Sequence, residues 1–60
     1  MIYDNIKAIC DKKKLSISAL EKMAGLGNGT IGGWKTASPT LSNLQAVAKV
    51  LKVKVSKLME

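Results

Sequence analysis

The sequence predicts an all-α fold, a compact set of five helices in one domain that spans residues 1–60. First, apolar residues recur three and four positions apart in successive stretches, which is the spacing of one helix face. Second, Ser, Thr and Gly, which favour helix ends, stand between those stretches. Third, sixty residues are enough for only one small hydrophobic core.

The first helix is predicted from Ile2 to Lys13, and its apolar stripe consists of Ile2, Ile6, Ile9 and Cys10. Asp4 lies in its first turn and lysines follow in its last, so both charges complement the helix dipole. On this stripe we interpret Cys10 as a small core residue rather than a reactive thiol. A single cysteine allows no intrachain disulfide and suits a reducing, cytosolic environment.

The second helix is predicted to begin after Ser16, a good N-cap. A competing capping box starts at Ser18 and ends at Glu21, but we favour Ser16. Gly25 follows the last inward residue of this helix, where a left-handed backbone closes it without a Cβ clash. With Ser16 as cap, the free N–H groups of the first turn can bind a phosphate.

The third helix is predicted from Gly27 to Lys35, with Leu26, Ile31 and Trp34 facing inward. Each internal glycine costs about 1 kcal/mol relative to alanine, so this helix depends on packing. Its opposite face carries Asn28, Gly29, Gly32 and Gly33 and is almost bare backbone. The Asn28 amide can either bond adenine or cap the helix. The interpretation of this bare face as an outward, DNA-facing surface requires residues 28–33 to form a helix.

Residues 36–40 read as a loop that contains Pro39, and Thr40 can cap a fourth helix. The apolar stripe of that helix is Leu41, Leu44, Val47, Ala48 and Leu51. Residues 51–55 alternate like a strand, but a lone strand has no partner. We therefore interpret Val53 and Val55 as core residues beside a turn, followed by a short fifth helix that contains Leu58 and Met59.

Composition favours an anionic partner such as nucleic acid, since ten lysines against four acids leave a net charge of +6. The alternative is that the lysines form only a solvated surface. The chain has no arginine and no histidine, and its carboxylates are scattered. We therefore expect no enzyme activity, metal site, cofactor or small-molecule substrate. No apolar run is long enough for a membrane span, and no signal peptide is apparent.

The order of these elements resembles the lambda-repressor-like, Cro/XRE-type helix-turn-helix family. The resemblance covers nearly the whole chain. It depends on the frame LSISALEKMAGLGNGTI, the proline loop, the pattern L-x-x-L-x-x-V-A-x-x-L-K-V and the closing L-M. It implies a five-helix domain that binds double-stranded DNA in transcription regulation, with repressor-like action and a weak homodimer. The helix-turn-helix unit covers about residues 16–35, and its second helix would lie in the major groove.

The resemblance also assigns site positions. The expected base-reading residues are Asn28, Gly29, Thr30, Gly32 and Gly33. The expected phosphate contacts are Ser16, Ile17, Lys35, Thr36, Ser38 and Thr40. This chain departs from the family by having glycines where long polar side chains are usual, Ile17 for a polar residue, Glu21 for a small one and Lys54 for a capping one. Glu21 is expected to add negative charge near the DNA.

A protein-interaction module on the same fold is the alternative function. Gly25, Gly29 and Gly33 recur every fourth residue, a spacing at which another helix can approach closely. We favour DNA binding because of the net charge and the resemblance.

Overall fold

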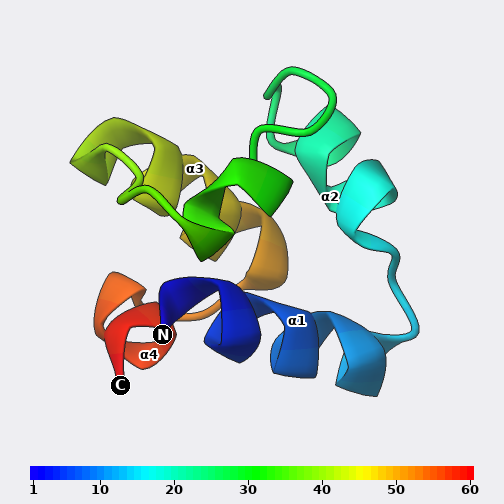
Figure 1. Cartoon of the computed structure of the whole chain (residues 1–60). Helices are drawn as coiled ribbons and strands as arrows, with labels where there is room; N and C mark the ends of the chain where they lie inside the picture. Colours follow the sequence, from blue (N-terminus) through cyan, green and yellow to red (C-terminus); the bar gives the residue numbers. More distant parts are fainter.

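The computed structural model describes all sixty residues and is all-helical, as predicted. It contains four α-helices and one short 3-10 helix, so the expected count of five α-helices is one too high. The elements are α1 (Ile2–Lys13), α2 (Ile17–Met23), η1 (Gly32–Lys35), α3 (Leu41–Leu51) and α4 (Val55–Met59). In Figure 1, α1 runs along the base, α2 and α3 lie above it, and α4 lies beside the start of α1. No helix combines the length and the apolar character that a membrane span needs.

The predicted bounds of the first helix are confirmed, with Ile6 and Cys10 fully buried on its inner face. The helix ends in a left-handed residue, Lys14, and the N–H of Leu15 bonds back to the carbonyl of Cys10 at 2.9 Å. On its outer face Lys7 Nζ donates to Asp11 Oδ1 at 2.7 Å, and this hydrogen bond raises the pKa of Lys7.

The core draws on every element of the chain. Its members have no more than 7 % of their surface exposed: Ile6, Cys10, Leu20, Ile31, Trp34, Leu44, Val47, Ala48, Leu51 and Leu58. The predicted inward position of Leu41 is wrong, since its side chain is 62 % exposed, and Met59 in the last helix is 60 % exposed. Both stand at the outermost turn of their helix, where no neighbouring element covers them.

The end of the chain is bound to α1. Asn5 Nδ2 donates to the carbonyl oxygens of Leu58 at 2.8 Å and Glu60 at 2.7 Å, so the two termini lie side by side (Figure 1). Val53 in the turn before α4 and Val55 at the start of α4 both pack against the core, as predicted. The alternating stretch at residues 51–55 is thus a helix end and a turn, with no strand.

Candidate nucleic-acid interface

The start of α2 has the predicted cap. Ser16 has an extended backbone, and its Oγ accepts from the N–H of Ala19 at 3.0 Å. The competing capping box from Ser18 does not form. The N–H groups of Ile17 and Ser18 lie in the first turn, where an α-helix offers them no acceptor. The Ile17 side chain packs partly against the core, which leaves mainly its backbone for contact with a phosphate.

The turn after α2 also forms as predicted. Gly25 has φ +74°, and the N–H of Leu26 bonds to the carbonyl of Glu21 at 2.8 Å. This bond pattern closes the helix and directs the chain away from its axis. In Figure 1 the chain then forms an exposed loop at the top of the molecule before it enters η1.

The prediction of one regular α-helix from Gly27 to Lys35 is wrong. Residues 28–31 form turns, and only Gly32–Lys35 forms a helix, of the 3-10 type. Gly29 has φ +87°, a conformation that cannot continue a right-handed helix. The glycines resist helix formation, and hydrogen bonds from outside the segment compete with the helical pattern. Asn28 and Gly29 therefore do not share a helix face with Gly32 and Gly33. The interpretation that required a helix over residues 28–33 is overturned in that form, and only the outward position of these residues remains to support base reading.

The predicted inward orientation of Ile31 and Trp34 is confirmed. Ile31 is fully buried and Trp34 is 7 % exposed. The bare backbone of the segment faces outward: a methyl group placed on Gly29, Gly32 or Gly33 would touch nothing within 4 Å. We call residues 27–33, with this open glycine edge, the reading segment, after the role that the family resemblance predicts for it. The exposed side chain of Asn28 makes no hydrogen bond within the protein, so it does not cap a helix.

Glu21 holds the reading segment from the inside. Its side chain is only 3 % exposed, and its two carboxylate oxygens accept from the N–H of Gly29 at 3.1 Å and of Ile31 at 2.7 Å. The carboxylate therefore faces the backbone of the segment rather than solvent, and the expectation that it adds negative charge near the DNA stays a prediction. Sequence reasoning missed this role. The available signal was a carboxylate on α2 shortly before a glycine-rich stretch rich in free N–H groups.

The residues after η1 have several contacts of their own. Lys35 Nζ lies 4.9 Å from the ring centroid of Tyr3, a cation–π contact with α1. Thr36 Oγ1 donates to the carbonyl of Gly33 at 3.4 Å, and Thr40 Oγ1 accepts from the N–H of Asn43 at 3.1 Å to cap α3. Ser38 is exposed and its side chain makes no hydrogen bond within the protein. The hydroxyl hydrogens of Ser38 and Thr40 can still be donated to a phosphate.

The lysines are unevenly distributed around this site. The reading segment has no charged residue, and Lys22 and Lys35 are the only lysines between residues 15 and 40. Two others are neutralised locally, Lys7 by Asp11 and Lys57 by Glu60 at 3.4 Å. The lysines at positions 12–14 directly precede the cap of α2. The remaining lysines are Lys49, Lys52 and Lys54, at the end of α3 and in the following turn.

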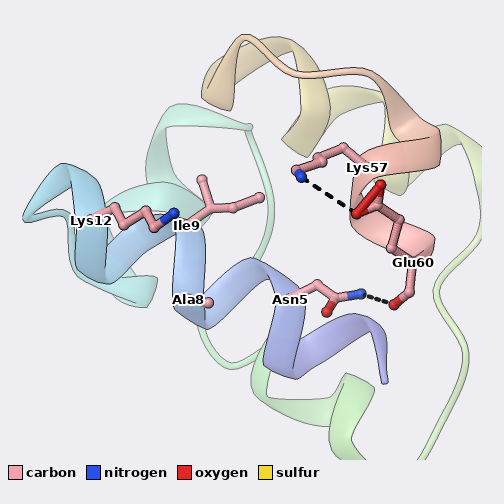
Figure 2. Close-up of a pocket in the computed structure, with 6 residues that line it drawn as sticks. All are labelled: Asn5, Ala8, Ile9, Lys12, Lys57 and Glu60. Atoms are coloured by element: carbon pink, nitrogen blue, oxygen red, sulfur yellow. Dashed lines mark hydrogen bonds and ion pairs between the residues drawn. The ribbon is translucent and has the colours of Figure 1, made fainter.

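A small pocket between α1 and α4 is lined by Asn5, Ala8, Ile9, Lys12, Lys57 and Glu60 (Figure 2) and has a volume of about 190 Å³. Its ionisable groups are two lysines and one carboxylate, and that carboxylate is paired with Lys57. No group of three side chains that could hold a metal ion occurs in the chain. The lining of this pocket contains no histidine, no cysteine and no second carboxylate.

These observations define the class of protein first: an all-helical domain in which a capped helix, a glycine turn and an exposed glycine-rich segment follow one another. The profile of the helix-turn-helix family, of the Cro/C1 type, matches residues 6–58. The chain belongs to this family of XRE-like DNA-binding regulators. Comparisons with curated proteins and with solved structures find no significant match.

Proposed function

We propose that this repressor-like transcriptional regulator places its reading segment against the major groove of double-stranded DNA. The observation that carries the proposal is the open glycine edge, which lies outward on the residues that the family resemblance predicts to read bases. Without side chains on Gly29, Gly32 and Gly33, the backbone can approach the base edges closely. Asn28 and Thr30 are the side chains that supply hydrogen bonds to bases.

Affinity in this proposal comes from phosphate contacts, which carry little sequence information. The contacts would be Ser16, the backbone of Ile17, Lys35, Thr36, Ser38 and Thr40. The net charge of +6 adds a general attraction to the polyanion. A weak homodimer on a palindromic operator completes the proposal, and the DNA itself would bring the two copies together.

Selection from random duplexes at two salt concentrations tests the proposal. The logarithm of the association constant should fall with the logarithm of salt by about 0.9 for each phosphate neutralised. Lys35→Ala should weaken binding evenly across sequences, whereas Asn28→Ala should relax the preference at one base pair. Lys57→Ala is a matched control, since that lysine is paired with Glu60 on α4. Binding that is insensitive to salt, or no binding to any duplex at low salt, would contradict the proposal.

The alternative, a docking surface for another helix, loses its structural basis. It required Gly25, Gly29 and Gly33 to line one face of a helix, and two of these three have a positive φ instead. Gly33→Arg separates the two functions, because the position is open and exposed. The added charge of the arginine should preserve or strengthen the affinity for a random duplex, although the close backbone approach at this position is lost. The same arginine would abolish a close protein contact by a steric clash.

A further inference from the structure

We propose that Glu21 is the positioning residue of the reading segment, so that sequence preference depends on a buried carboxylate that never touches DNA. This inference rests on the proposed function. It assigns to α2 a second task besides its contact with the DNA backbone, namely to hold the segment that reads the bases.

The burial of Glu21 requires a compensating contact. A carboxylate taken out of water is costly unless it is paired or hydrogen-bonded. No ion pair involves Glu21. The compensation comes from the N–H groups of Gly29 and Ile31, and hydrogen bonds to an ionised acceptor are about twice as strong as neutral ones. The carboxylate and the segment therefore stabilise each other.

The two bonds fix the segment at two points, one on each side of Thr30. Gly29 adopts the left-handed conformation that turns its N–H toward the interior, and a non-glycine residue would be strained there. Ile31, the other donor, is fully buried, so its bond to Glu21 at 2.7 Å is shielded from water. With both N–H groups held inside, the glycine edge and Asn28 remain outside.

Few other contacts can replace this restraint. Residues 28–30 have no regular helix to hold them, and the nearest backbone bonds within the segment are Thr30 N to Gly27 O at 3.1 Å and Gly33 N to Gly29 O at 3.1 Å. Loss of the carboxylate would let residues 28–30 adopt many conformations, while the side chain of Ile31 and the rest of the core stay packed. DNA would then have to order the segment on binding, which lowers the affinity for the preferred sequence.

Glu21→Gln is the sharpest test, because it keeps the shape of the side chain. Its amide has one acceptor oxygen, and its NH₂ group would face one of the two backbone donors. We expect hydrogen exchange at the Ile31 amide to accelerate about tenfold to a hundredfold, without matching acceleration at core amides such as that of Val47. Affinity for the selected duplex should fall toward that for a random duplex, while affinity for the random duplex stays unchanged.

Glu60→Gln is the matched control, since it removes the same charge from an exposed carboxylate on the other side of the molecule. Gly29→Ala is a second variant in case the first unfolds: it leaves Glu21 in place but strains the left-handed donor, and it should also accelerate exchange at Ile31 selectively. If exchange rises equally at Ile31 and Val47 and the sequence preference persists, Glu21 serves stability alone and the inference is wrong. If the unaltered protein shows no preference among duplexes, the proposed function itself is wrong. Selection with the unaltered protein alone gives that result, so it is distinguishable from a failure of the Glu21 inference.

Discussion

Two lysines adopt a backbone conformation that ordinarily belongs to glycine. Lys14 has φ 56° and Lys52 has φ 59°, and each closes the helix that precedes it. For a side chain with a Cβ, this conformation costs about 1–2 kcal/mol. The backbone at the ends of α1 and α3 is therefore strained at these lysines, and a glycine substitution can relieve the strain.

Lys52→Gly should stabilise the protein by about 0.5–1 kcal/mol, because relief of the strain exceeds the extra freedom that glycine has in the unfolded chain. Chemical denaturation measures the free energy of unfolding. Lys49→Gly is the control: that residue is exposed within α3, and glycine there should destabilise by about 1 kcal/mol. If Lys52→Gly lowers the free energy of unfolding as Lys49→Gly does, the left-handed cap is not strained.

The thiol of Cys10 is fully buried, and burial raises its pKa above the ordinary value. Folding therefore favours the neutral thiol. This contribution is fully present below the ordinary thiol pKa and is lost as the pH rises through the raised value. The free energy of unfolding should fall at alkaline pH more steeply in the unaltered protein than in Cys10→Ala, as measured by denaturation across pH 7 to 11. Parallel curves would contradict this.

At the scale of elements, helix caps decide where the chain turns. Ser16 and Thr40 each accept a backbone N–H three residues ahead, at 3.0 and 3.1 Å. Both were predictable, because Ser and Thr before an apolar stripe are strong start signals. The local competition between Ser16 and Ser18 was resolved by Glu21, which bonds the reading segment instead of completing a capping box.

Ser16→Ala should destabilise the protein by about 1 kcal/mol, because it removes the cap of α2. Ser18→Ala should change the free energy of unfolding by less than about 0.5 kcal/mol, since its exposed side chain makes no hydrogen bond. Thermal or denaturant unfolding of the pair provides the measurement. A larger loss for Ser18→Ala would mean that the capping box forms in solution.

At the scale of the whole molecule, α4 is a helix of only five residues and depends on its contacts with the rest. Leu58 inserts into the core and Asn5 binds the backbone at the end of the chain (Figure 2). The reading segment depends on the rest in the same way, through Ile31, Trp34 and Glu21. Both short elements gain their order from the larger ones.

Asn5→Ala should destabilise the protein by about 1–2 kcal/mol, because two hydrogen bonds to the chain end are lost. Exchange at the Leu58 amide should accelerate more than exchange within α3. Gln45→Ala, an exposed position on α3 without a side-chain hydrogen bond, serves as the control and should be nearly neutral. Equal acceleration throughout the molecule would show that α4 does not open separately.

Sequence alone predicted most of the fold. Local spacing and residue type predict the ranges of α1 and α3 and the caps Ser16 and Thr40. They also predict the turn at Gly25 and the burial of Trp34. These features depend on residues within a few positions of one another. The helix-turn-helix family follows from the same local signals in fixed order, and the family match supports it.

Tertiary structure alone decided the shape of the reading segment. Its glycines allow several conformations at similar free energy, so no local pattern selects one. The selection comes from Glu21, eight and ten residues before its two donors, and from the burial of Ile31. A buried carboxylate gains enough from two backbone N–H groups to override a weak helix. The carboxylate of Glu21 reaches these two N–H groups only after α2 has packed against the core.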